Sequence, residues 1–149
     1  MPSKEFVRVV PVRERLAPTT LDLEVIFTDL AETRVALAAA TQYAHDLGAQ
    51  ITILNAQVVP YPLPLERPPV PVEFTEQTLR ALASEQTIET AVELYLCRDR
   101  NDTIRQVLRP ESMVVISGRK RWWPTAENRL AKLLRRDGHR VIFAAPSFA

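Results

Sequence analysis

The chain has 149 residues, of which 46% are hydrophobic and 25% are charged, and its formal net charge at pH 7 is +1. This composition suits one compact domain with a sizeable core, and the balanced charge excludes a strong overall attraction to nucleic acid or to a membrane surface. The single cysteine, Cys97, excludes an internal disulfide and a cysteine-rich metal site. Because there is neither an apolar run of roughly 18 residues nor a secretory leader, we expect a soluble, cytoplasmic protein.

Residues 1–20 are expected to form an N-terminal extension to a domain that spans residues 21–149. The stretch KEFVRVVPV has the composition of a short strand, but three prolines (Pro2, Pro11 and Pro18) interrupt the extension. A strand at the edge of a sheet has unpaired backbone groups that invite pairing with other chains. The segment EFVRVVPV is therefore a candidate for covering or exchanging with such an edge.

The next part of the chain alternates strand and helix. LEVIFTD (23–29) is a β-prone run, and ETRVALAAATQYAHDLGA has a helical pattern that ends at Gly48, a residue type that favours a left-handed helix cap. QITILNAQVV (50–59) predicts the second strand. The helical spacing predicts a buried face made of Val35, Ala38, Ala39, Tyr43, Ala44 and Leu47.

The stretch PYPLPLERPPVP (60–71) holds half of the twelve prolines. Proline lacks the backbone donor that a ladder or helix needs, so this stretch predicts a loop with extended character. Tyr61 and Leu63 supply apolar groups in this loop. A lid, a segment that docks a partner, and a loop packed against its own domain are all compatible with the sequence.

The second half of the chain continues the alternation. EFTEQTLRALASE (73–85) predicts a helix, and VELYLC (92–97) alternates apolar residues with Glu93 and Tyr95, which favours a strand with one wetter face, most naturally at an edge. Asn101 or Asp102 is expected to cap the short helix DTIRQVL.

The last elements are a buried strand, a helix and a strand. They are SMVVIS (112–117), TAENRLAKLLRR after Pro124, and RVIFAA (140–145). Alternating strands and helices predict an α/β fold with a mostly parallel sheet, helices on both faces, and a ligand crevice at the carboxyl ends of the central strands. Asp29, Ala56 and Gly118 would lie at the rim of that crevice.

Several stretches taken together resemble a universal stress protein domain over roughly residues 22–145: LEVIFTDLAETRVALAAATQYAHDLGAQITILNAQVV, SMVVISGRK and AENRLAKLLRRDGHRVIFA among them. The resemblance implies a flavodoxin-like or Rossmann-like sheet of five parallel strands in the order 3-2-1-4-5, which agrees with an edge position for VELYLC. It also implies a role in the stress response and a homodimer formed through the C-terminal edge strand RVIFAA.

Members of this family that bind ATP share a stretch of the form G-x2-G-x9-G-[ST]. Gly118 matches the first glycine, Arg121 stands at the second, and Glu127 and Asn128 stand near the last two positions. A non-glycine residue in left-handed geometry costs on the order of 1–2 kcal/mol. The bulky side chains of Trp122 and Trp123 would fill the space that a triphosphate occupies in family members that bind ATP. A negative charge at Glu127 repels phosphate. These departures predict an impaired nucleotide site.

The resemblance nevertheless names the residues that would hold ATP or AMP. They are Asp29 near the ribose and adenine, the backbone of Ala56, and Gly118. In the alternative hypothesis, the side chains of Arg119, Arg121 and Asn128 hold the phosphates in place of the missing glycine amides. Arginine clamps phosphate bidentately, so side chains can replace glycine amides. A third interpretation is that the loop RKRWW (119–123) binds single-stranded nucleic acid or an acidic partner, although so short a cluster argues against nucleic acid.

Catalytic groups cannot be assembled from the sequence. Cys97 has no histidine that can be placed beside it, and His45 and His139 have no metal-like spacing to other ligands. We therefore expect no enzyme activity and no metal. A regulatory or interaction domain that needs no cofactor is the first hypothesis, and a protein that binds ATP or AMP is the alternative.

Overall fold

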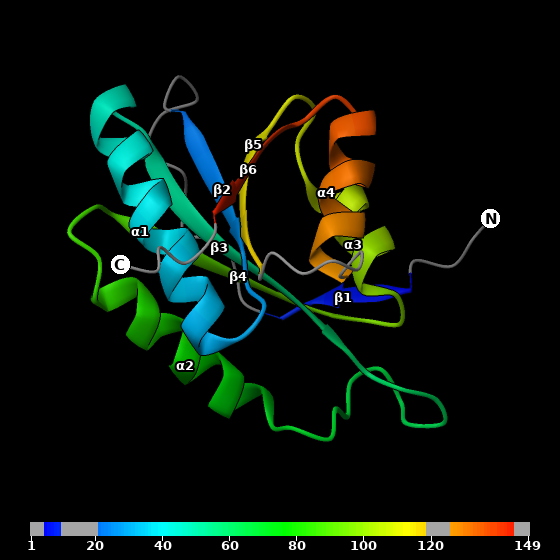
Figure 1. The fold of residues 1–149 in the computed structure, drawn as a ribbon. Helices are drawn as coiled ribbons and strands as arrows, with labels where there is room; N and C mark the ends of the chain where they lie inside the picture. The colour runs from blue at the N-terminus through cyan, green and yellow to red at the C-terminus, as the bar shows by residue number, and fades with distance from the viewer. Residues whose placement is uncertain (1–4, 10–20, 119–125, 145–149) are drawn as a thin grey trace.

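The computed structural model describes residues 5–9, 21–118 and 126–144, and these ranges form strands and helices in alternation (Figure 1). Of the residues singled out in the sequence, Arg119 to Pro124 lie outside them. The elements in chain order are β1 (Phe6–Arg8), β2 (Asp22–Ile26), α1 (Leu30–Leu47), β3 (Gln50–Val58), α2 (Val72–Ser84), β4 (Thr90–Cys97), α3 (Arg100–Val107), β5 (Met113–Ser117), α4 (Ala126–Arg136) and β6 (Arg140–Ala144).

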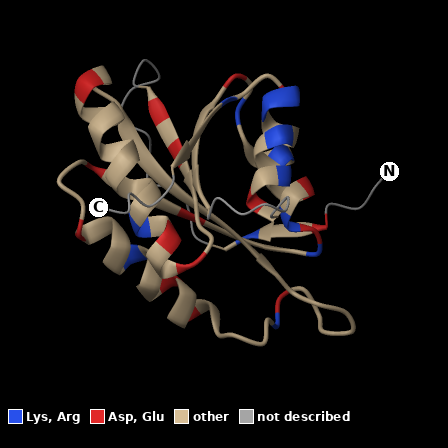
Figure 2. Cartoon of the chain, in the orientation of Figure 1, with Lys and Arg blue, Asp and Glu red and all other residues tan. Residues whose placement is uncertain are grey.

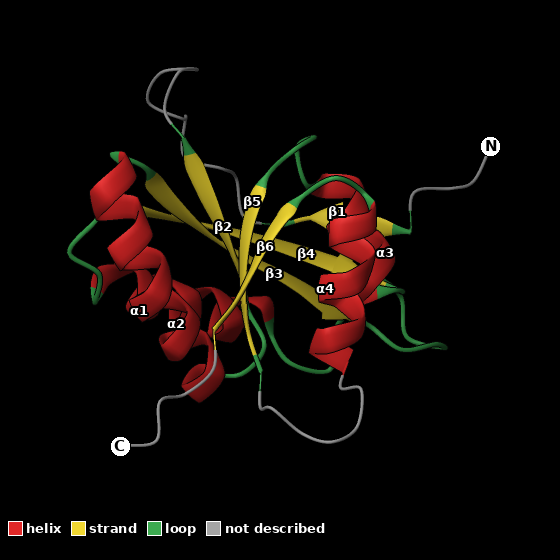
Figure 3. Ribbon diagram, turned by 45° about the horizontal axis from the view of Figure 1, so that its top comes forward, coloured by secondary structure: helices red, strands yellow, loops and turns green. Residues whose placement is uncertain are grey.

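The strands form one mostly parallel sheet in the order β1-β4-β3-β2-β5-β6. Every neighbouring pair is parallel except β1 with β4, which is antiparallel. Figure 3 shows α1 and α2 on one side of the sheet and α3 and α4 on the other. The predicted α/β class is confirmed.

The predicted five-stranded sheet with VELYLC at an edge is wrong in its details. A sixth strand, β1, pairs with β4, so that β4 lies inside the sheet and β1 forms the edge. The five parallel strands keep the order β4-β3-β2-β5-β6. The polar residues of β4 misled the prediction, because Glu93 and Tyr95 are buried at 5% and 7% exposure. The prediction that the N-terminal segment covers an edge is confirmed.

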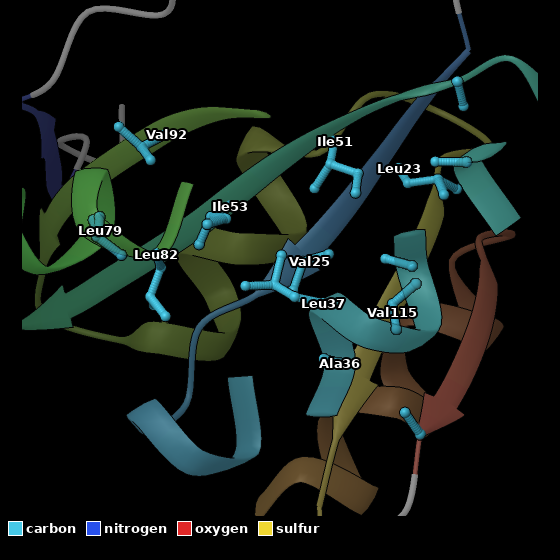
Figure 4. Packing of buried hydrophobic residues seen from close by; sticks show 14 of the residues in the cluster. Leu23, Val25, Ala36, Leu37, Ile51, Ile53, Leu79, Leu82, Val92 and Val115 are labelled. Atoms are coloured by element: carbon cyan, nitrogen blue, oxygen red, sulfur yellow. The ribbon is translucent and has the colours of Figure 1, made fainter. Parts of the chain in front are cut away.

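The core is divided by the sheet into two layers. On one face α1 and α2 pack on the strands through Leu37, Leu79 and Leu82, some of the residues that Figure 4 labels. On the other face α3 and α4 pack through Ile104 and Leu130. Both faces of the central strands are therefore covered, which explains why β2, β3 and β5 read as continuous apolar runs.

Helix α1 buries a face that agrees only in part with its spacing: Ala44 is buried and Val35 and Ala39 pack against the core, whereas Ala38 is exposed. Its buried residues are Thr33, Ala36, Leu37, Ala40 and Ala44. Tyr43 and Leu47 are 44% and 46% exposed, so they lie outside the core. Alanines lie on both the buried and the exposed side of the helix, so apolar spacing alone does not select the face that packs on the sheet. Gly48 ends the helix at φ 65°, as predicted.

Helix α3 begins at a capping aspartate, and α4 has one buried apolar side and one charged side. The N-cap of α3 is Asp99, whose carboxylate accepts from the Asp102 backbone N–H at 3.0 Å, so the predicted caps Asn101 and Asp102 are wrong by two or three residues. In α4, Leu130 and Leu134 are buried. Lys and Arg lie along its exposed surface in Figure 2.

No helix in the described ranges is long and apolar enough to cross a membrane.

The proline loop between β3 and α2 is a pair of turns rather than a simple extended segment. Leu63 N–H donates to Pro60 O at 3.0 Å and Arg67 N–H donates to Pro64 O at 2.9 Å. Arg98 holds the loop to the end of β4: its guanidinium donates to Val59 O and Leu63 O at 2.9 and 2.8 Å and stacks on Tyr61 at 4.1 Å. The loop is thus attached to its own domain, while Tyr61 is 71% exposed.

Candidate functional site

The carboxyl ends of the parallel strands carry groups from five elements (α1, β3, α3, β5 and α4) and from the loops after β2 and β5. We call this the carboxyl-edge site and define it by Thr28, Asp29, Glu32, Ala56, Arg100, Ser117, Gly118 and Glu127. Arg100, in the first turn of α3, donates to Phe27 O at the end of β2 at 3.4 Å. Glu32 of α1 reaches Ser117 of β5. These contacts join the loops that follow β2, β4 and β5, where ligands bind in open α/β sheets.

Asp29 is placed at this edge as the N-cap of α1. Its carboxylate accepts from the Glu32 backbone N–H at 2.8 Å, and its carbonyl accepts from Thr33 N–H at 2.9 Å. The side chain therefore satisfies a backbone donor that the helix start leaves open. Asp29 is exposed, so capping leaves it accessible, and contact with a ligand stays a prediction.

Ala56 faces the core with its side chain, which is 4% exposed. β2 ends at Ile26, opposite Leu54, and β3 continues beyond it. Leu54 O accepts from Phe27 N–H at 2.8 Å, so the Leu54 backbone points toward β2. Backbone groups point to alternate sides along a strand, so those of Ala56 point to the side on which β2 has ended. A role for the Ala56 backbone in binding stays a prediction.

Gly118 is explained by packing. A Cβ atom built on it would lie 2.8 Å from Phe143 Cζ and 3.2 Å from Glu127 Cβ. Its backbone N–H faces Ala144 O of β6 at 3.4 Å. The residue therefore allows β6 and the start of α4 to approach the end of β5, whether or not a ligand binds there.

Replacing Gly118 by alanine is expected to lower the free energy of unfolding by about 1–3 kcal/mol, because Phe143 must move. Adding Phe143→Leu, which removes the ring, should recover part of this loss. Gly138→Ala serves as the control, since its cost comes from φ 95° and should not respond to Phe143→Leu. Urea denaturation of the single and double variants measures the coupling, and additive effects at positions 118 and 143 would contradict the packing explanation.

Carboxylates occupy the space between α1, β5 and α4. Ser117 is 1% exposed and its hydroxyl donates to Glu32 Oε2 at 2.9 Å. Glu127 lies in the first turn of α4 and packs against Gly118. Glu32 and Glu127 therefore lie beside the end of β5, and Asp29 adds a third carboxylate at the start of α1.

Among the described residues, Arg100 brings a positive charge that interacts with Glu127. Burial lowers the pKa of its guanidinium below the ordinary value, and the charge of Glu127 opposes that effect. Arg98, its neighbour, is engaged by the proline loop. Arg119 and Arg121, predicted to contact phosphate, lie outside the described residues. Asn128 is half-buried in α4, next to Glu127.

Four residues of this site were missed in the sequence: Thr28, Glu32, Arg100 and Ser117. Glu32 carries a recognisable signal, since an acidic residue three positions after a helix cap is a common N-terminal pattern. Thr28 and Arg100 each lie two or three residues beyond a strand end, the rule that selected Asp29 and Gly118. The side-chain oxygen of Thr28 is buried and has no hydrogen-bond partner in the structure.

The two histidines lie in different surroundings. His139 is buried, and its Nδ1 accepts from Ser112 N–H at 3.1 Å. His45 is exposed on α1. Among the described residues, no three or more His, Cys, Asp or Glu side chains gather into a group that could hold a metal ion.

Cys97 is expected to be unreactive in the folded protein. It is fully buried and its thiol contacts Gln57 O at 3.5 Å. Burial raises the pKa of the thiol, which lowers the fraction of reactive thiolate. Alkylation by iodoacetamide should be at least about 1,000-fold slower than in denaturant, because it requires opening of the sheet. Mass spectrometry follows the modification, and rapid labelling under native conditions would show that β1 leaves β4 readily.

Comparison with solved structures relates this arrangement to known proteins. A universal stress protein from Archaeoglobus fulgidus matches with a TM-score of 0.59 at 15% identity, over 83% of this chain and 93% of that one. This chain has the universal stress protein fold. A structure of the universal stress protein from the same organism in complex with dAMP also matches this chain. The TM-score is 0.52 at 15% identity, over 84% of this chain and 97% of that one. No protein-family model matches the sequence, and no curated protein does.

Proposed function

We propose that the protein is a non-enzymatic regulatory or interaction domain of the universal stress protein type whose nucleotide site is impaired. The observation that carries the proposal is the position of carboxylates at the carboxyl-edge site. Glu32 is bonded to Ser117 at the end of β5, and Glu127 packs against Gly118 at the start of α4. Helix starts of this kind favour anions, and here the protein supplies the anion itself.

Charge makes this arrangement unfavourable for a polyphosphate. Two like charges about 4 Å apart repel by about 4 kcal/mol at the effective dielectric constant of a protein surface. ATP would bring several negative charges toward an edge where Glu127 and Asp29 lie at helix starts and Glu32 accepts from the Ser117 hydroxyl. The fold therefore keeps the topology of a nucleotide-binding sheet while its described side chains oppose the phosphates.

Calorimetric titration with ATP, AMP and dAMP tests this proposal, with tryptophan fluorescence followed in parallel. We expect no saturable signal at ligand concentrations up to about 1 mM, which corresponds to a binding free energy weaker than about −4 kcal/mol. Saturable binding in the micromolar range would overturn the proposal. A nucleotide that co-purifies with the protein would overturn it as well.

The alternative function is binding of ATP or AMP through arginine side chains in place of a glycine-rich loop. Two observations favour it: the Arg100 guanidinium lies at this edge, and a protein of similar fold is described in complex with dAMP. In that case Arg100→Gln should weaken binding at least about tenfold, as should Arg121→Ala. Arg129→Gln on the outer surface of α4 is the matched control and should leave the affinity unchanged.

The proposal includes a homodimer formed through β6. Among the described strands, β6 pairs only with β5, and Val141, Ile142 and Phe143 of this edge are half-buried. An apolar edge strand without a neighbour is prone to pair with another chain. Sedimentation at increasing protein concentration tests the dimer, and a monomer throughout the range would remove this part of the proposal.

A further inference from the structure

A pocket of about 570 Å³ lies at the amino-terminal edge of the sheet, opposite the carboxyl-edge site. The starts of β2, β5 and β6 form its floor, and the α3–β5 and α4–β6 loops form its walls. Its charged and polar lining residues are Asp22, Glu24, Arg109, Glu111, Ser112 and Arg140. The volume falls within the range of small-molecule sites in proteins, about 300–1,000 Å³.

The two arginines of this pocket differ from the three arginines that form ion pairs among the described residues. Arg34, Arg80 and Arg105 each form an ion pair with a carboxylate. The guanidinium groups of Arg109 and Arg140 form no ion pair or hydrogen bond within the structure that the described residues make. Their donors are therefore available to a ligand, and a guanidinium binds carboxylate or phosphate through two parallel hydrogen bonds.

The loops that carry these arginines are bonded to each other. Ser112 N–H donates to His139 Nδ1 at 3.1 Å, and Arg140 N–H donates to Ser112 O at 3.0 Å. The Ser112 hydroxyl donates to Arg109 O at 2.6 Å. Arg105 of α3 and Asp137 after α4 add a two-bond ion pair at 2.7 and 2.9 Å. The backbones of Arg109 and Arg140 are thus fixed relative to each other before any ligand arrives.

Both loops contain left-handed residues where they border the pocket. Gly138 adopts φ 95°, which glycine tolerates, but Glu111 adopts φ 58°, which is uncommon for a residue with a side chain. Such a conformation costs on the order of 1 kcal/mol and persists where surrounding structure imposes it. Here the hydrogen bonds of Ser112 with Arg109, His139 and Arg140 hold the turn that contains Glu111, and Arg109 begins this turn at the pocket.

We propose that this pocket binds a small organic oxyanion, a phosphate monoester or a carboxylate, held by Arg109 and Arg140. The apolar side chains of Leu47 and Met113 suit an organic body. On the β2 side of the lining, the Asp22 carboxylate accepts from the Thr52 hydroxyl at 3.0 and 3.1 Å, and Glu24 is buried. This site is separate from the carboxyl-edge site and does not depend on the function proposed for it.

Titration of the isotope-labelled protein with inorganic phosphate, phosphoethanolamine and succinate tests the proposal by NMR. Saturable shifts of the Glu111, Ser112 and Gly138 amides are expected with at least one probe below about 20 mM. Arg109→Gln and Arg140→Gln should each weaken that binding about tenfold or more. Both are surface substitutions, and unchanged amide spectra without ligand confirm that they fold.

Arg129→Gln is the matched control, because Arg129 is an exposed arginine of α4 that does not line the pocket. It should leave the affinity unchanged. The proposal is overturned if none of the three probes gives saturable shifts, or if the shifts map to another surface. Equal weakening by Arg129→Gln and Arg140→Gln would also overturn it, since that result indicates general charge attraction.

Discussion

Leu37→Ala is expected to lower the free energy of unfolding by about 2–5 kcal/mol, whereas Leu47→Ala should lower it by less than about 1 kcal/mol. Both residues belong to α1 and both substitutions keep a strong helix former. Leu37 is 1% exposed and packs in the core, and Leu47 is 46% exposed near the end of the helix. The difference therefore isolates burial from helix propensity.

Urea denaturation followed by circular dichroism measures both variants under identical conditions. The pair also decides between two faces of α1, because the helical spacing alone places Leu47 inside and the structure places Leu37 inside. A larger loss of stability for Leu47→Ala would show that α1 packs on the sheet through the face that the sequence predicted.

The stability of the protein is expected to fall by about 2–3 kcal/mol as the pH rises from about 10 to about 12, through Tyr95 alone. Burial, and then the charge of Glu93, raise the pKa of the Tyr95 phenol from 10.0 to about 12. In the unfolded chain the phenol loses its proton near its ordinary pKa, while in the folded protein it keeps it. The unfolded state binds fewer protons in this window, so unfolding becomes more favourable. Below about pH 10 the contribution is fully present.

Tyr95→Phe removes the ionisable group and keeps the ring that packs edge-on against Phe6 at 5.9 Å. The difference in unfolding free energy between the two proteins should shrink or change sign with rising pH, and other titrating groups cancel in that difference. The phenolate absorbance of the wild type minus that of Tyr95→Phe isolates the titration of Tyr95 from that of the other two tyrosines. Parallel stability curves for the two proteins between about pH 9 and pH 11.5 would contradict the buried, carboxylate-facing position of this phenol.

The order of the parallel strands and their helices could be predicted because each element carries a local signal. Gly48 ends α1 in the left-handed conformation that only glycine adopts at little cost, and the apolar runs of β2, β3 and β5 reflect burial on both faces. The pairing of β1 with β4 was predicted only as one candidate among free edges. It depends on contacts between Phe6 and Tyr95, 89 positions apart, which no local pattern encodes.

The prediction of an exposed face on β4 failed for a related reason. Polar residues in a strand indicate exposure to solvent only if no buried group forms hydrogen bonds with them. Here the Tyr95 hydroxyl donates to the Glu93 carboxylate inside the protein, at 3.5 Å. At the carboxyl-edge site, Asp29 and Gly118 could be predicted from the sequence, because each lies just after the end of a predicted strand. Glu32 was not predicted, because its hydrogen bond with Ser117 depends on where α1 lies relative to β5.

The ATP affinity of the wild-type protein relative to Glu127→Gln tests the central claim most directly, namely that carboxylates at the end of β5 and the start of α4 oppose phosphate. Calorimetric titrations at about 50 and 200 mM salt compare the two proteins, with Glu73→Gln at the exposed start of α2 as the control. We predict that Glu127→Gln binds ATP at least about tenfold more tightly than the wild type and that this advantage is larger at low salt. Equal or weaker binding by Glu127→Gln at both salt concentrations would contradict the account.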